Sequence, residues 1–274
     1  MIKKATQSLL REVGLYHRLK GSVMYDCYWR IANGRIIDQR DREIAFYREL
    51  LTGYRPGDLI FDIGANHGSK TDVFLRLGAR VVAVDPDEVN TDILRQRFLE
   101  YRIRKKPLVV VQKAISDNHG TETIWIDAPG SAKNSLSRKW VDALRSNADR
   151  FDQRFEFSRQ KQVETTTLDN LIHVYGLPLF IKIDVEGYEV NVLRGLRRPV
   201  PFISFEVNLP EFRAEGLQCV ELLERLAPRG AFNFATDCRR GLAMKHWLQT
   251  EAFAKVIGNC TEHSVEVFWA APVV

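Results

Sequence analysis

From Leu59 onward, short runs of consecutive apolar residues alternate with amphipathic stretches of helical length. Runs that are apolar at every position are typical of strands buried on both faces of a parallel sheet. Because parallel strands are joined by right-handed crossovers, the alternation predicts a doubly wound α/β sheet. The predicted strands are Leu59–Ile63, Arg80–Val84, Leu108–Lys113, Thr123–Ile126, Phe180–Asp184, Phe202–Val207, Phe232–Thr236 and Val265–Ala270.

The two ends of the chain do not show this alternation of strand and helix patterns. The stretch between the last two predicted strands reads as irregular, so these strands are predicted to form an antiparallel hairpin at one edge of the sheet. Residues 1–55 read as helical up to the breaker at residues 54–58, which predicts an N-terminal helical cap before a single domain at 56–274. The polar region 128–162 is interpreted as a long excursion over the sheet edge.

A glycine turn follows the first predicted strand and indicates a ligand site. Asp62 closes that strand, and Gly64, Ala65, Asn66 and Gly68 follow it. The glycines are spaced G-x-x-x-G rather than G-x-G-x-x-G, and an acid beside them would repel a pyrophosphate. The same acid attracts the positive charges of S-adenosylmethionine, so we interpret the turn as a site for that cofactor. A purely structural turn between strand and helix is the alternative.

Two further segments extend the predicted cofactor site. Asp85 closes the second strand and precedes Pro86, a placement that suits a carboxylate accepting hydrogen bonds from ribose hydroxyls. After the third strand, Ala114, Ile115 and Ser116 are predicted to form a flat slot beside the adenine. For any one of these three residues, an ordinary exit from a strand is the competing interpretation.

Composition excludes several classes of protein. The 274 residues are 45% hydrophobic and 27% charged, as in an ordinary globular protein. The net charge of +5 is a small excess, and its densest basic run, residues 101–106, reads as a solvated surface, so nucleic-acid binding is not favoured. Four dispersed cysteines, no signal peptide and no membrane span predict a cytoplasmic protein.

Several blocks, in order from residue 61 to about 210, resemble the FkbM family of methyltransferases. They are FDIGANHGS (61–69), VVAVDPDEVN (81–90), KAISDNHGT (113–121), TTTLDNL (165–171), IKIDVEGYEVNVLRGL (181–196) and ISFEV (203–207). The resemblance implies a class I, Rossmann-like fold with a mostly parallel seven-stranded sheet, S-adenosylmethionine as methyl donor with S-adenosylhomocysteine as product, and a hydroxyl acceptor. His67 and Asp85 stand where the family more often has an aliphatic residue and a glutamate.

A hydroxyl acceptor must lose its proton, which requires a base or a metal ion. Asp184 and Glu186 follow the predicted strand 180–184 and are the candidate catalytic groups, with His67 as a further base. Helix capping, or an ion pair of Asp184 with Lys182, is the structural alternative. A less favoured hypothesis is a Mg²⁺ ion held by Asp184, Glu206 and Asn208.

The acceptor itself cannot be identified from these motifs, and a sugar, polyketide or glycan hydroxyl suits them equally. An RNA ribose methyltransferase would share the fold and cofactor, and a cofactor-binding accessory protein without activity is a second alternative. A nicotinamide oxidoreductase is disfavoured by Asp62 and by the glycine spacing. A homodimer is a further hypothesis.

Overall fold

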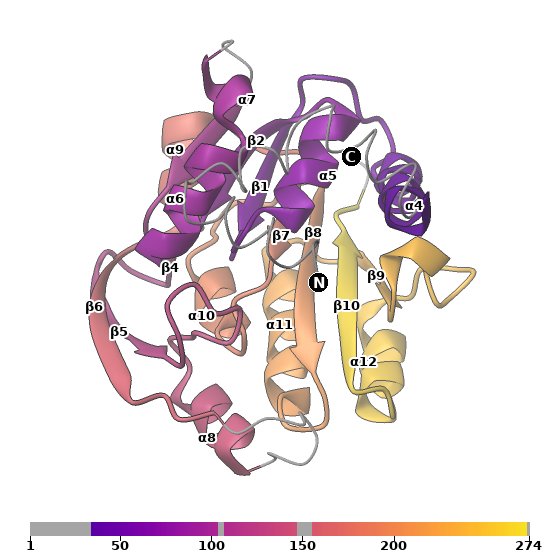
Figure 1. Ribbon diagram of the computed structural model, residues 1–274. Coiled ribbons are helices and arrows are strands. Elements are labelled where there is room, and N and C mark those ends of the chain that lie inside the picture. Colours follow the sequence, from indigo (N-terminus) through magenta and orange to yellow (C-terminus); the bar gives the residue numbers. More distant parts are fainter. Residues whose placement is uncertain (1–33, 104–106, 147–154, 273–274) are drawn as a thin grey trace.

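The computed structural model describes residues 34–103, 107–146 and 155–272. Its main sheet has seven strands in the order β3-β2-β1-β7-β8-β10-β9 (Figure 1). Adjacent strands are parallel from β3 to β8, whereas β10 is antiparallel to both β8 and β9. The strands of this sheet are β1 (Leu59–Ile63), β2 (Arg80–Val84), β3 (Leu108–Val111), β7 (Phe180–Ile183), β8 (Phe202–Asn208), β9 (Ala231–Ala235) and β10 (Ser264–Ala270). The predicted doubly wound, mostly parallel seven-stranded sheet is confirmed.

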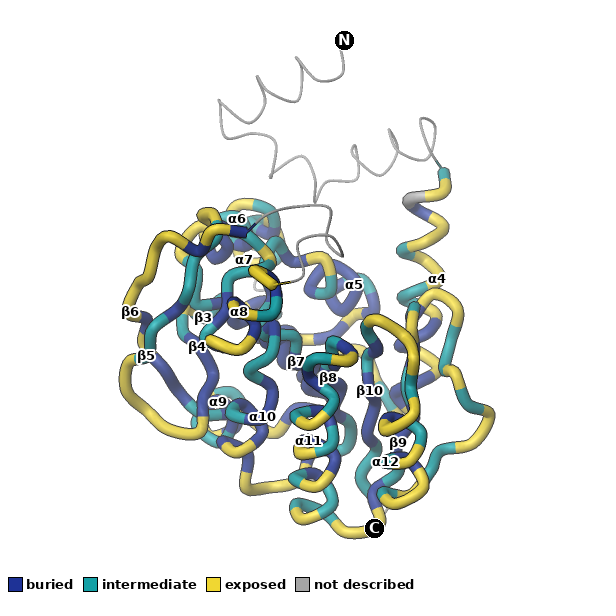
Figure 2. Tube along the Cα trace, turned by 90° about the horizontal axis from the view of Figure 1, so that it is seen from below, coloured by how far each residue is buried: buried dark blue, intermediate teal, exposed yellow. Residues whose placement is uncertain are grey.

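Helices cover both faces of the sheet because its strands present apolar side chains on both sides. Along β1, Phe61 and Ile63 pack into one core cluster and Ile60 into the other. Buried positions are accordingly concentrated in the strands (Figure 2). The first cluster packs under α9 (Leu168–Tyr175), α10 (Glu189–Arg194), α11 (Arg213–Leu226) and α12 (Thr250–Gly258), and the second under α4 (Gly34–Leu50), α5 (Ser69–Leu77) and α6 (Glu88–Arg97).

A second, three-stranded sheet lies beside the main one and was not predicted. It has the order β4-β6-β5, with β4 (Ala114–Ile115), β5 (Gly120–Ile126) and β6 (Arg159–Thr166). The predicted strand 123–126 therefore belongs to this sheet, where β5 is antiparallel to β6. The predicted excursion 128–162 is also partly regular, because it contains α8 (Arg138–Ser146) and the start of β6.

The edge of the main sheet corrects a second expectation. The antiparallel pairing of β9 with β10 is confirmed, but the two strands do not form a hairpin. The short 3₁₀ helix η2 (Cys238–Arg240) and α12 lie between them, in the stretch expected to be irregular. α12 is anchored by Phe253 and Ile257, which pack into the first core cluster.

Helix α4 represents the described part of the predicted N-terminal cap, whose first 33 residues lie outside the described ranges. Tyr47 on α4 is fully buried and contacts the rings of Phe74 and Phe180 edge-on or tilted. α4 thus packs on the core of the main domain. The remaining helix, α7 (Leu99–Ile103), follows α6. Within the described ranges no helix has the length and apolar character needed to cross a membrane.

Candidate functional site

A cavity opens at the carboxyl edge of the sheet, where β1 is flanked by β2 on one side and β7 on the other. The chain reverses its winding direction between these neighbours, and ligands of doubly wound sheets bind in the crevice at such a point. We call this space the inner cavity. It is lined by Ile63, Gly64, Asn66, Val84, Asp85, Pro86, Asp87, Asn90, Lys113, Ala114, Ile115, Ile124, Ser131, Ala132, Asn134, Ser135, Leu136, Asp184, Val185, Glu186 and Tyr188.

The glycine turn brings the backbone of β1 against that of β7. Gly64 has φ +79°, and a β-carbon at this position would collide with the backbone carbonyl of Asp184. Gly68 has φ +77° and precedes α5, where a β-carbon would clash with side chains of α6. Both glycines are therefore required by positive φ and by close packing. Only Gly64 lines the inner cavity.

Asp85, at the end of β2, is the hub of a hydrogen-bond network on one wall of the inner cavity. Its Oδ2 accepts from the backbone N–H of Asn66 at 2.8 Å. Its Oδ1 accepts from the backbone N–H of Asp87 at 2.9 Å and from the side-chain amide of Asn90 at 3.0 Å. Burial raises the pKa of Asp85 to about 6 despite these donors. Asp87 and Asn90 were not singled out in the sequence, although both lie in the block that carries Asp85.

The part of the inner cavity next to β4 and β5 is more apolar than the part around Asp85. Ala114, Ile115 and Ile124 line it, as does Tyr188 at the N-cap of α10. The phenol of Tyr188 donates to Glu122 of β5, and Ser116 donates to the same carboxylate at 2.6 Å. Ser116 is fully buried and supports this wall without lining it. Tyr188 was missed because its position depends on the second sheet.

Three other predicted site residues, Asp62, Ala65 and His67, do not line the inner cavity. Asp62 is buried, its Oδ2 accepts from the Thr71 hydroxyl at 2.5 Å, and its Oδ1 has no hydrogen-bond partner among the described residues. Burial raises the pKa of Asp62, and nearby Lys182 opposes that rise. Ala65 is buried, and its backbone N–H donates to the Val84 carbonyl at 3.0 Å. His67 lines neither this cavity nor the cleft described below.

A strap formed by residues 127–137 crosses the inner cavity. The side chain of Asn134 and the backbone N–H of Gly130 donate to Asp87 at 3.0 and 2.9 Å. Lys133, which lies between them in the sequence, pairs with Glu186 at 3.0 Å. The remaining cavity volume is about 110 Å³, whereas cavities that hold ligands generally exceed about 300 Å³. A ligand of nucleoside size therefore requires the strap to move outward.

A larger, open cleft of about 1020 Å³ lies on the other side of Asp184, and we call it the outer cleft. It is bounded by α4, α5, the ends of β7 and β8, β10 and the segment after β9. Asp184 lines both spaces. Asn208 lines neither. The charged residues lining the outer cleft are Arg40, Glu43, Lys70, Asp72, Arg97, Lys182, Asp184, Glu206, Asp237, Arg239, Arg240, Glu262 and Glu266.

Strong electrostatic coupling marks the boundary between the two spaces. Buried Lys182 donates to Oδ2 of Asp184 at 2.7 Å, which confirms the ion pair expected from the sequence. Burial alone would raise the pKa of Asp184, but the charge of Lys182 holds this pKa below its usual range. Burial raises the pKa of Glu186 to about 7, opposed by Lys133. Burial and the charge of Asp184 raise the pKa of Glu206 to about 8. One ionised carboxylate thus lies beside two that titrate near neutrality.

Comparison with known families matches residues 62–234 to the methyltransferase FkbM domain. This match covers more than half of the chain and includes most of the inner cavity. No curated protein sequence matched the chain.

Three solved structures that are similar to this one at low sequence identity are described as methyltransferases. Methyltransferase FkbM from Methylobacillus flagellatus is 17% identical with a TM-score of 0.49, over 81% of this chain and 46% of that one. This chain thus spans about half the length of that protein. A TehB-like SAM-dependent methyltransferase from Corynebacterium glutamicum is 12% identical with a TM-score of 0.41, over 84% and 88%. A SAM-dependent O-methyltransferase from Thermotoga maritima is 10% identical with a TM-score of 0.38, over 84% and 65%.

Proposed function

From the premise that this chain belongs to the FkbM methyltransferase family, we propose that it transfers the methyl group of S-adenosylmethionine to a hydroxyl oxygen of a polar small molecule or glycan. The observation that carries the proposal is the position of Asp184 on the wall shared by the inner cavity and the outer cleft. A donor in one space and an acceptor in the other would meet at this carboxylate, which is the arrangement that in-line transfer requires.

The inner cavity suits the donor along its whole length. Asp85 can accept hydrogen bonds from the ribose hydroxyls, and Pro86 lies beside it. Ala114, Ile115 and Tyr188 offer apolar surface to the adenine. The turn at Gly64 and Asn66, together with Asp184, would enclose the amino-acid end of the cofactor. Asp62 and Gly68 do not line the inner cavity, so in this proposal they act indirectly, by stabilising the glycine turn.

The outer cleft suits a hydrophilic acceptor. Among the described residues, its lining carries both signs of charge, no aromatic side chain and few apolar ones. Such a surface favours a molecule with many hydroxyl groups over a flat apolar one, because apolar ligand surface would gain little from burial there while charged groups would lose water. Among the acceptors considered from the sequence, a sugar or glycan therefore fits better than a polyketide.

The carboxylates at the boundary supply what the transfer needs from the protein. The acceptor oxygen attacks the methyl carbon, the carbon–sulfur bond breaks, and the hydroxyl proton must leave. Lys182 keeps Asp184 ionised, so Asp184 can accept a hydrogen bond from the hydroxyl and orient it. Glu186, whose pKa of about 7 lies near the operating pH, is the better proton acceptor.

Calorimetric titration with S-adenosylhomocysteine, followed by assays with hydroxylated acceptors, tests this function. We expect micromolar binding, and Asp184→Asn should suppress turnover far more strongly than it weakens the binding of S-adenosylhomocysteine. Asp92→Asn, an exposed change on α6, is the matched control. Failure of the folded chain to bind S-adenosylhomocysteine would refute the proposal. Binding without turnover on any acceptor would favour an accessory protein.

A further inference from the structure

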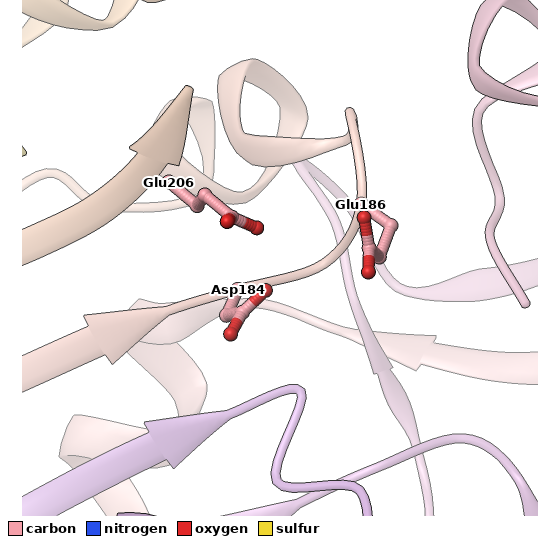
Figure 3. A group of neighbouring side chains, drawn as sticks. All are labelled: Asp184, Glu186 and Glu206. Carbon is pink, nitrogen blue, oxygen red and sulfur yellow. The ribbon is translucent and has the colours of Figure 1, made fainter. Parts of the chain in front are cut away.

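Three carboxylates from two adjacent strand ends converge at the boundary between the inner cavity and the outer cleft. Asp184 follows β7, Glu186 lies two residues further along the same turn, and Glu206 belongs to β8. One oxygen from each lies within 4.8 Å of the others. Figure 3 shows the three side chains turned toward a common space. Like charges this close repel one another unless protons or a cation compensate them.

The positive groups nearby compensate only part of this charge. Lys182 contacts Oδ2 of Asp184, and Lys133 contacts Oε1 of Glu186. Glu206 accepts instead from the Ser264 hydroxyl at 2.7 Å, and no ion pair joins it to a cation within the described parts of the chain. Three acids therefore share two lysines.

Glu186 provides a second observation that points to a ligand. This residue is only 9% exposed. Its Oε2 atom is buried and has no hydrogen-bond partner among the described residues. A buried carboxylate oxygen without a donor costs free energy, and natural structures rarely tolerate one without a bound partner. The carboxylate is directed toward Asp184 and Glu206 (Figure 3), so the missing partner would lie among the three acids.

The turn that carries Glu186 is held by contacts of its own. Glu186 has φ +54°, a left-handed conformation that is uncommon for a residue with a side chain. Oε1 of Glu189 accepts from the backbone N–H groups of Val185 and Gly187 at 3.1 and 3.3 Å, which holds the turn from the α10 side. The Ser135 hydroxyl of the strap donates to the Glu186 carbonyl at 2.7 Å and also holds the turn. The backbone of the turn that carries the Glu186 side chain is thus held in place by supporting residues.

We propose that Asp184, Glu186 and Glu206 bind one divalent cation, Mg²⁺ or Mn²⁺, at the boundary of the two cavities. All-oxygen, anionic ligands suit these hard cations. With metal–oxygen bonds of about 2.1 Å, ligand oxygens in an octahedral site lie about 3.0 Å apart when adjacent and about 4.2 Å apart when opposite. Oxygens within 4.8 Å of one another would have to draw closer together, by rotation of the side chains, to reach that geometry. Compared with the set expected from sequence, Glu186 replaces Asn208.

The role of the cation rests on the proposed methyl transfer, although its binding does not. The Asp184 side chain is 36% exposed, which leaves room for further oxygen ligands. A hydroxyl bound there would be placed beside the donor cavity. With Glu186 bound to the cation, its carboxylate is no longer the free proton acceptor of the metal-free site. The cation would instead lower the pKa of a bound hydroxyl, whose proton would pass to solvent in the outer cleft.

Titration of the chelator-treated full chain with Mn²⁺, followed by the electron paramagnetic resonance signal of the free ion, tests the site without any acceptor. We expect one saturable Mn²⁺ per chain, displaced by excess Mg²⁺. Glu206→Gln should weaken Mn²⁺ binding at least tenfold, although the glutamine can still accept the hydrogen bond from the Ser264 hydroxyl. Glu186→Gln is a second variant with the same expectation. Glu221→Gln, an exposed acid on α11, should bind as the unmodified chain does.

Absence of saturable binding, or equal Mn²⁺ affinity in the unmodified chain and both site variants, would overturn the inference. Titration with S-adenosylhomocysteine in metal-free buffer separates this result from the proposed function. If S-adenosylhomocysteine binds and Mn²⁺ does not, only the metal site fails. If Mn²⁺ binds through these carboxylates and S-adenosylhomocysteine does not, the metal site stands and the methyltransferase proposal fails.

Discussion

The backbone N–H of Asn66 donates to Oδ2 of Asp85 over 2.8 Å, so the turn after β1 and the end of β2 are joined directly by a hydrogen bond. The two segments that the sequence marks as a cofactor site are therefore one unit. A change at Asp85 should be felt in the glycine turn as well as at the ribose.

Asp85→Asn should weaken binding of S-adenosylhomocysteine about 10- to 100-fold. The substitution removes a charged acceptor, and hydrogen bonds to charged groups contribute about 1.5–3 kcal/mol. Calorimetry gives the affinity, and circular dichroism checks that the variant is folded. Asp92→Asn should bind normally. Unchanged affinity in folded Asp85→Asn would remove this carboxylate from the cofactor site.

Gly64→Ala should destabilise the protein far more than Gly53→Ala. Both glycines have positive φ, at +79° and +83°, but a β-carbon at Gly53 meets nothing within 4 Å. The control therefore measures backbone strain alone, about 1 kcal/mol. Gly64→Ala adds the collision with the Asp184 carbonyl and should cost several times as much. Urea unfolding measures both, and equal losses would contradict the close approach of β1 to β7.

Stability should fall as the pH rises from about 5 to 8, and Glu189→Gln should reduce that fall. Burial raises the pKa of Glu189 to about 8 in the folded chain, against about 4.3 when unfolded. Between these values the folded state holds the extra proton, so the stabilisation present at low pH is lost as pH rises through about 8. Each such group contributes at most about 1.4 kcal/mol per pH unit.

Glutamine at position 189 keeps an oxygen that can accept from Val185 and Gly187 but cannot ionise. Urea unfolding at pH 5, 7 and 9 should therefore show the variant gaining on the unmodified chain as the pH increases. A constant difference between the two chains at all three pH values would show that Glu189 does not retain its proton.

Lys133→Met should speed the binding of S-adenosylhomocysteine. The inner cavity can admit a nucleoside only when the strap moves, and the Lys133–Glu186 pair ties the strap to the turn after β7. Stopped-flow fluorescence should show a larger association rate constant for the variant. Lys139→Met, which removes a pair with Glu215 outside both cavities, is the control. Equal rates in all three chains would mean that the strap does not limit entry.

Much of the sheet was predictable because its signals are local. β1 and β2 agree with their predicted bounds, since each is mostly apolar and has an acid at its carboxyl end, Asp62 within β1 and Asp85 directly after β2. β6 was missed because its residues are mostly exposed and polar, and its place is fixed by pairing with β5 rather than by its own pattern. α12 was missed because its apolar positions, Phe253 and Ile257, become meaningful only against the sheet.

The candidate site divides in the same way. Asp85 and Gly64 could be found from the sequence alone, because each directly follows a predicted strand. The pairing of Lys182 with Asp184 also followed from strand alternation. Glu186 was likewise named from its place in the turn after the predicted strand 180–184. In contrast, Tyr188 and Lys133 were missed, because their places in the site depend on the second sheet and on the strap, which approach from elsewhere in the chain. The helical cap, the homodimer and the cytoplasmic location stay predictions.

The outer cleft is assembled largely from two stretches on either side of the segment that matches the family. α4 contributes Arg40 and Glu43, and the chain from residue 235 to 266 contributes much of the opposite wall, whereas the family match runs from 62 to 234. If the outer cleft holds the acceptor, as proposed, acceptor choice and donor binding depend largely on different segments of the chain. Chimeras that exchange residues 34–50 and 235–266 between related enzymes should redirect methylation while retaining the donor, which makes these borders natural sites for engineering new acceptor specificities.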